Sequence, residues 1–184
     1  MGQVVKAAAS ASALAVAEAP GQYLTFSLSG EMFGLGILNV KEIIEYGNLT
    51  EIPMMPAFIR GVINLRGSVV PVIDLAARFS GQATAIGRRT CIVIVEVPDD
   101  NTLHDIGIIV DAVSEVLEIP GSEIEPPPSF GTKIRADFIF GMGKVNGKFV
   151  ILLNINNVLS VEEIAMLTAA DGSNADSGSP SGGH

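Results

Sequence analysis

The chain has 184 residues, enough for one domain or two small, closely joined domains. A core of this size needs no disulfide bond or metal ion to be stable. Its net charge of −9 argues against a nucleic-acid-binding protein, because phosphate backbones require clustered Lys and Arg. The single cysteine, Cys91, excludes an internal disulfide framework and fits a reducing compartment.

The apolar content is aliphatic, since apolar residues make up 48% of the chain but aromatic residues only 5%. This composition suits closely packed strands. A charge or a Gly/Pro turn interrupts every long apolar run before it reaches the length of about 20 residues that crosses a bilayer. The sequence therefore predicts no transmembrane segment.

Both ends differ in composition from the middle. Residues 1–21 are rich in Ala and Ser with one positive charge, Lys6, and we predict a flexible tail. A Lys before an apolar run is also the pattern of a signal peptide, so an export signal remains the alternative. Residues 171–184 contain mainly Gly, Ser, Asp and Asn, which predicts disorder. The ordered domain is expected over 22–170.

The first half reads as short strands with one helix. Tyr23–Leu28 is a short β-type run, and residues 40–46 are ambiguous between strand and helix, with strand favoured. In "LRGS", Gly67 predicts a tight hairpin turn. The apolar strand that follows contains Pro71, which predicts a strand edge or a bulge because proline cannot donate a hydrogen bond. Asp74 then predicts the N-cap of a short helix.

The second half shows the same elements. Cys91–Val97 reads as a strand, and Gly147 in "VNGK" predicts a second hairpin turn. Asn154 occupies the place of the first helix cap. Ser160 and Glu163 have the spacing of a capping box, which predicts a C-terminal helix over 160–170.

The two halves are copies of one unit. Residues 58–61 match 138–141 at an offset of 80 (141 − 61), and the segment from Gly34 matches that from Gly107 at an offset of 73 (107 − 34). Four or five short strands per unit indicate a small closed barrel. The predicted fold is all-β with few short helices: one barrel over about 22–80 and a second over about 88–159.

No residue pattern indicates catalysis or a cofactor. His104 lies in a polar turn and His184 in the tail, and neither has a second His or Cys at metal-ligand spacing. The glycines of "GMGKVNG" (141–147) fit neither nucleotide-binding fingerprint. We therefore predict a protein that is not an enzyme and has no metal or cofactor.

Arg66 is the strongest candidate for a binding residue. A solvated charge is the alternative for an Arg in a turn, but the duplicate has Asn146 there, so the turn itself does not require Arg. Glu42 lies on an element that strand pairing could bring alongside, and Arg is enriched at binding hot spots. Arg60, whose duplicate is Phe140, is predicted to be a solvent-facing charge.

Three segments carry a family resemblance: "FGLGILNVKEI" (33–43), "PAFIRGVINLRGSVVPVIDLAARF" (56–79) and "IGIIVDAVSEVLEI" (106–119). They closely resemble the CheW chemotaxis coupling proteins, over nearly the whole ordered domain. The resemblance implies two five-stranded SH3-like barrels and a cytoplasmic adaptor recruited to membrane-associated chemoreceptor arrays. The adaptor would link chemoreceptor tips to the regulatory domain of the CheA histidine kinase, and it could form rings with further copies.

The resemblance also assigns residues to two faces. The receptor face would contain Val40, Glu42, Gly61 and Arg66, and the kinase face Gly107, Val113 and Gly141. Two other functions remain open. One is an adaptor in a related receptor–kinase pathway that controls surface motility or biofilm formation. The other is an exported or small-ligand-binding β protein, which would require residues 1–21 to be a signal peptide.

Overall fold

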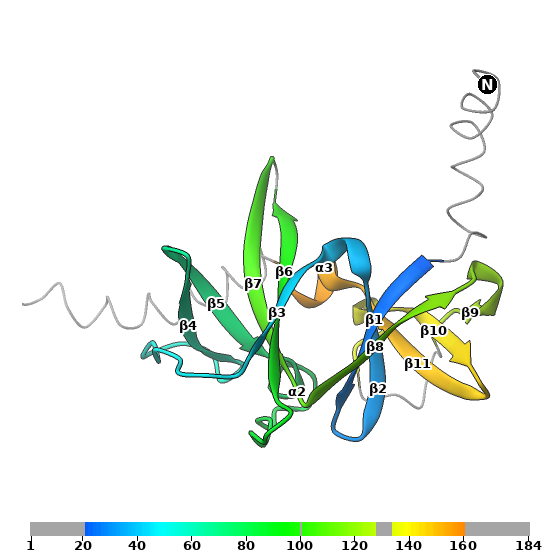
Figure 1. Cartoon of the computed structure of the whole chain (residues 1–184), viewed down its shortest axis with the longest axis horizontal. Helices are drawn as coiled ribbons and strands as arrows, with labels where there is room; N and C mark the ends of the chain where they lie inside the picture. The colour runs from blue at the N-terminus through cyan, green and yellow to red at the C-terminus, as the bar shows by residue number, and fades with distance from the viewer. Residues whose placement is uncertain (1–20, 100, 128–133, 161–184) are drawn as a thin grey trace, which may run out of the picture.

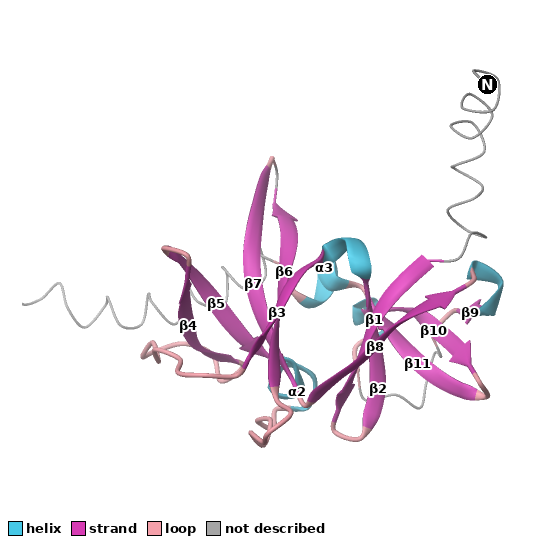
Figure 2. Ribbon diagram, viewed as in Figure 1, coloured by secondary structure: helices cyan, strands magenta, loops and turns pink. Residues whose placement is uncertain are grey.

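Eleven strands form two sheets within residues 21–99, 101–127 and 134–160, which are the residues that the structure, a computed structural model, describes (Figure 1). The first half contains β1 (Gly21–Leu28), β2 (Glu31–Gly36), β3 (Val40–Glu45), β4 (Ile59–Leu65), β5 (Ser68–Asp74) and helix α2 (Leu75–Ser80). The second half contains β6 (Cys91–Asp99), β7 (Thr102–Val110), β8 (Ala112–Ile119), β9 (Ile124–Glu125), β10 (Ile139–Val145), β11 (Lys148–Leu153) and helix α3 (Ile155–Val158). The predominance of strands over short helices confirms the all-β prediction (Figure 2).

Each sheet combines strands from both halves of the sequence. One sheet has the order β8-β1-β2-β11-β10-β9, and the other has the order β3-β6-β7-β5-β4. The prediction of one barrel over 22–80 and another over 88–159 is therefore wrong. The reason is that the hairpins of each half leave strand edges unpaired, and these edges pair with strands of the other half.

The exchange of strands is symmetric. If β1 to β5 are matched in order with β6, β7, β8, β10 and β11, the order β3-β6-β7-β5-β4 becomes β8-β1-β2-β11-β10. This is the order of the first five strands of the other sheet, which β9 extends. The duplication seen in the sequence is thus present in the fold as two intertwined copies.

The segment that follows each edge strand completes the barrel. After β8 the chain passes through a short 3-10 helix (Gly121–Glu123) into β9, which pairs with β10 at the far edge. After β3, Thr50 forms a bridge with Val62 of β4, with both backbone hydrogen bonds at 2.9 Å. Both glycines that the copies share on these strands, Gly61 and Gly141, lie where this segment crosses.

Most strands are apolar on both faces because they border two cores. The largest buried cluster lies between the sheets and includes Phe26 and Phe33 of one sheet and Val95 and Ile108 of the other. The short helices α2 and α3 contribute to this cluster and lie between the sheets (Figure 1). Smaller clusters occupy the interior of each barrel. Burial of a Val, Ile or Leu side chain contributes about 1.5–3 kcal/mol, so the shared cluster holds the two sheets together.

Most local predictions are confirmed. Residues 40–45 form a strand, and the hairpin turns place Gly67 and Gly147 at φ +86° and +77°. Asp74 and Asn154 cap α2 and α3 by accepting hydrogen bonds from backbone N–H groups three residues later. The helix predicted over 160–170 and both predicted tails lie outside the described residues, except for Gly21 and Ser160.

Pro71 lies at an unpaired strand edge, one of the two sites that the sequence predicted. It belongs to β5, faces Val62 of β4 in regular register, and has no partner on the side toward β7. The proline is tolerated because parallel pairing between β5 and β7 begins only at the next residue, Val72. No ladder hydrogen bond is therefore lost.

Candidate functional site

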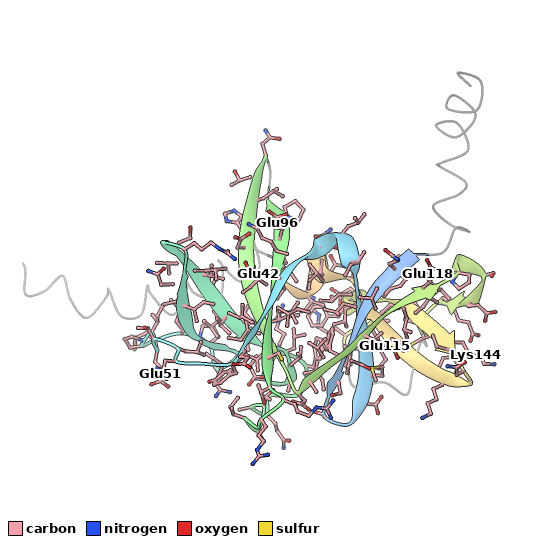
Figure 3. The ribbon with its side chains drawn as sticks, in the orientation of Figure 1. Glu42, Glu51, Glu96, Glu115, Glu118 and Lys144 are labelled. Atoms are coloured by element: carbon pink, nitrogen blue, oxygen red, sulfur yellow. The ribbon has the colours of Figure 1, made fainter. Side chains whose placement is uncertain are left out.

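Arg66 and Glu42 form an exposed two-pronged ion pair. The Arg66 Nη1 lies 2.7 Å from Glu42 Oε2, and Nη2 donates to Oε1 at 2.9 Å. Glu42, labelled in Figure 3, lies on β3, and Arg66 lies on the β4–β5 turn, so the two residues come from the two edge strands of the same sheet. The pair thus links the two edges of this sheet. The predicted proximity of Arg66 and Glu42 is confirmed.

The backbone at Arg66 would suit another residue better. Its φ is +53°, and the equivalent Asn146 has φ +50°. Such a left-handed conformation costs most residues about 1–2 kcal/mol, whereas Asn and Gly adopt it readily. The duplicate carries the residue that the turn favours. Arg66 is therefore placed here for its side chain, at some cost to the turn.

The ion pair changes the titration of both members. The hydrogen bond from Arg66 lowers the pKa of Glu42 below its ordinary value of 4.5, against the opposing effect of desolvation. The hydrogen bond to Glu42 in turn raises the pKa of Arg66. Both groups are therefore charged at neutral pH, and the pair persists across the physiological range.

We expect the contribution of this pair to folding to disappear in acid. Because the pKa of Glu42 is lower in the folded chain than in the unfolded chain, the stabilisation is present above pH 4.5 and lost as the pH falls through the folded-state value. Urea unfolding of the wild type and Glu42→Gln should therefore differ by a constant amount near neutral pH. The difference should shrink in acid, and a difference that did not change with pH would contradict the assignment.

A second charged cluster adjoins the first. Lys41 Nζ lies 2.9 Å from Asp105 Oδ2 on β7 and 3.6 Å from Glu96 Oε2 on β6. The hydrogen bond to Asp105 raises the pKa of Lys41. The labelled Glu42 and Glu96 lie on the same side of this sheet (Figure 3). Sequence analysis missed the cluster, since these residues are brought together only by pairing between strands of different halves.

The prediction for Arg60 is wrong, because its guanidinium is bound to a buried carboxylate. Arg60 Nη1 donates to Asp74 Oδ2 at 2.8 Å, and the Asp74 side chain is fully buried. Asp74 also accepts hydrogen bonds from Ala77 N, Thr84 N and Thr84 Oγ1. The predicted helix cap is thus confirmed and is also the centre of an ion-paired network. A β-bulge at Ile59–Gly61 places Arg60 within reach, and this bulge has no signal in the sequence.

The other residues predicted for the receptor face, Val40 and Gly61, are less accessible. Val40 is half-buried on β3 and packs against the cluster between the sheets. Gly61 is buried, and a Cβ there would overlap the carbonyl oxygen of Thr50. Gly61 thus has a packing role in closing the barrel.

The three residues assigned to the kinase face do not form one patch. Gly107 is buried in β7, where a Cβ would lie 2.8 Å from Ile92 Cγ2. Gly141 is buried on β10 of the other sheet, and a Cβ there would lie 2.6 Å from Ile124 Cγ2. Val113 is half-buried on the edge strand β8. Of the three, Val113 alone offers a side chain at an edge.

Within residues 21–99, 101–127 and 134–160, no group of three or more His, Cys, Asp or Glu side chains is arranged to hold a metal ion. In the same part of the chain, no helix has the length and apolar character required to span a membrane.

Comparison with known proteins places these features in a family. The CheW-like domain model matches residues 22–163. The chain is 36% identical over 146 residues to chemotaxis protein CheW of Klebsiella aerogenes, covering 79% of this chain and 86% of that protein. It is 32% identical over 150 residues to protein FrzA of Myxococcus xanthus, covering 80% and 91%. The crystal structure of the scaffolding protein TtCheW from Thermoanaerobacter tengcongensis superposes with a TM-score of 0.69 at 39% identity, covering 76% and 87%. The chain belongs to the CheW family.

Proposed function

We propose that this chain is a non-enzymatic adaptor that couples the signalling tips of chemoreceptors to a CheA histidine kinase. It acts in the cytoplasm and is recruited to membrane-associated receptor arrays. The observation that carries the proposal is the exposed Glu42–Arg66 pair on a CheW-family fold. Arg66 adopts an unfavourable left-handed backbone conformation, and its side chain is 70% exposed.

The receptor face is proposed to be the surface around Val40, Glu42 and Arg66. Glu42 holds the guanidinium in one orientation, so less side-chain freedom is lost when a partner binds. Arg66 remains accessible at the end of the turn, where its other donors can reach backbone or carboxylate groups of a receptor helix. Gly61 supports this face indirectly by allowing the segment with Thr50 to pack closely.

The kinase face is proposed to include the edge strand β8, where Val113 lies. Exposed β8 residues include Val116, which is 47% exposed, and Glu115 and Glu118, labelled in Figure 3. Gly107 on β7 and Gly141 on β10 are buried away from this edge, so they would support the kinase face through strand packing rather than direct contact. The same kind of edge contact would allow further copies of the chain to join the ring.

Such an adaptor works through many weak contacts. Once it is held in an array, the effective concentration of its partners makes each contact sufficient. A receptor helix that lies in a groove of the adaptor transmits a signal if its two states bind with different affinity. The chain needs no chemistry of its own for this role.

Reversal of the charge at Arg66 should weaken binding to a receptor signalling-tip fragment by about 1–3 kcal/mol, or roughly 5-fold to 150-fold. The expected cause is loss of the accessible guanidinium and repulsion between the new carboxylate and Glu42. Isothermal titration calorimetry with Arg66→Glu measures the loss, and circular dichroism checks the fold.

The duplicate provides the control for this experiment. Asn146→Glu changes the equivalent turn on the other sheet and should leave receptor binding unchanged. Equal losses at both positions would show that the receptor face is misplaced. An unfolded Arg66→Glu variant would show that the pair is required for folding, which contradicts its assignment as a binding residue.

The output of the pathway is a separate question. The relative named FrzA shares this domain but not the chemotaxis name, so the fold is compatible with an adaptor in a receptor–kinase pathway for surface motility or biofilm formation. Affinity purification of the native complex from the source organism, followed by mass spectrometry, would identify the kinase and receptors and so distinguish the two.

A further inference from the structure

Strands β5 and β7 separate into a fork at one end of their sheet. Parallel pairing joins Val72–Asp74 to Gly107–Ile109 and stops there. Beyond this point the arms Ser68–Pro71 and Leu103–Ile106 continue without pairing to each other and line a cavity of about 470 Å³. Figure 1 shows the β4–β5 and β6–β7 hairpins standing apart at this end. These two arms are called the fork below.

Pro71 ends the ladder and so opens the fork. Both the N–H and the C=O of Val62 bond to Thr50, so these groups face away from β5. In an antiparallel pair, the residue opposite must likewise face away from its partner. Pro71, opposite Val62, therefore faces β7, but it has no N–H to donate. In the duplicate, Ile151 replaces Pro71 and pairs with Phe33 of β2, so the parallel ladder extends one residue further there.

Main-chain groups line both arms. By the same alternation Val69, two residues before Pro71, directs its N–H and C=O into the fork. Leu103 pairs with Pro98 of β6, which has no N–H to donate. The backbone N–H and C=O of Leu103 therefore point toward β5, and by alternation those of Asp105 do so too. Within the described residues, neither strand pairing nor the backbone contacts outside the strands supply partners for these groups. Such edges are templates for an added strand.

The side chains of the fork define what would fit. Val69 and Leu103 are 70% and 61% exposed, and they present apolar surface on opposite arms. Glu96 and Asp105 line the same cavity, and the one ammonium there, Lys41, already contacts both carboxylates. The fork therefore combines apolar surface with an excess of negative charge.

We propose that the fork binds an extended segment of a partner protein, which adds as a strand along β7 with alternating apolar and basic side chains. The apolar side chains contact Val69 and Leu103, and a Lys or Arg lies near Glu96 and Asp105. The chain's own residues 161–184 contain four carboxylates and no Lys or Arg, so their charge does not complement the fork. A second copy, with a net charge of −9, is equally unsuited.

Titration of the isotope-labelled full chain with a synthetic peptide tests this by NMR. The probe is acetyl-Thr-Val-Lys-Val-Lys-Thr-amide, and its control has Glu in place of both Lys. The basic peptide should shift the amide resonances of Val69, Leu103 and Asp105, and it should bind at least about tenfold more tightly than the acidic peptide, because like charges in contact are strongly disfavoured.

Two variants sharpen the experiment. Leu103→Pro removes one N–H from the fork. No hydrogen bond to β6 is lost, because the residue opposite on β6 is Pro98 and this pair is not hydrogen-bonded. The substitution should weaken peptide binding about fivefold or more. Phe149→Thr changes the exposed apolar residue on β11 that corresponds to Val69 in the other copy, and it should leave peptide binding unchanged.

The proposal would be overturned by no shifts at millimolar peptide, by shifts confined to residues outside the fork, or by equal binding of the two peptides. Shifts that depend on protein concentration alone would also overturn it, since they would show that a second copy occupies the fork. The proposal goes beyond the adaptor function, and its failure would leave the Arg66 experiment unaffected.

Discussion

Replacement of Asp74 with alanine should lower the free energy of unfolding by about 3–5 kcal/mol, the range for removal of one partner of a buried ion pair. The Asp74 carboxylate is fully buried and accepts hydrogen bonds from Arg60, Ala77 and both donors of Thr84. The substitution leaves the mostly buried Arg60 unpaired and the N-terminus of α2 uncapped. Urea unfolding followed by circular dichroism measures the loss.

The duplicate supplies the matched control for Asp74. Asn154 caps α3 in the same way, but its side chain oxygen accepts only from Asn157 N and has no ionic partner among the described residues. Asn154→Ala should therefore cost about 1 kcal/mol, the usual value of a helix cap. Similar losses at the two positions would show that the ion pair and the Thr84 contacts add little to the cap.

Gly61→Ala should destabilise the fold by about 3 kcal/mol or more, because two separate costs combine. Gly61 has φ +153°, where side chains are strained, and its Cβ would overlap the carbonyl oxygen of Thr50 and lie 3.0 Å from the carbonyl carbon. The Thr50–Val62 bridge that closes the barrel would have to move. Thermal and urea unfolding both report this change.

Gly67→Ala separates the two costs. Gly67 has φ +86° with no atom within 4 Å of the added Cβ, so this substitution introduces strain alone and should cost about 1–2 kcal/mol. If Gly61→Ala were no worse than Gly67→Ala, the close approach to Thr50 would be unimportant. If Gly61→Ala kept full stability but lost receptor binding, Gly61 would be a direct contact rather than a packing residue.

Local features of this fold could be predicted because each depends on residues close together in sequence. The turn at Gly67 and the caps at Asp74 and Asn154 follow from short-range backbone chemistry. Comparison of the copies also identified Arg66, since a residue that the duplicate replaces is not required by the shared backbone. The contact with Glu42 was also predicted, but through a strand pairing that does not form, since β3 and β4 lie at opposite ends of the sheet order.

Long-range pairing could not be predicted in the same way. Alternation shows which residues form strands but not which strand lies beside which, so the exchange between halves was missed. The Arg60–Asp74 pair was missed because it depends on a bulge, and a shift of one residue in a strand moves a side chain to the other face. The fork likewise depends on where the β5–β7 ladder ends.

The intertwined topology has a consequence for how the chain is made. As the first half leaves the ribosome, β1, β2, β3 and β5 each lack one neighbouring strand that belongs to the second half and is synthesised later. The β3-β6-β7-β5-β4 sheet cannot form until β7 has emerged, and the other sheet cannot form until β11 has emerged, so pairing between distant segments favours slow folding. During that interval the nascent chain exposes unpaired strand edges, so its solubility in the cell should depend on chaperones and on the rate of translation. Once folded, the two barrels should unfold as one cooperative unit, because opening either one removes strands from both halves of the chain.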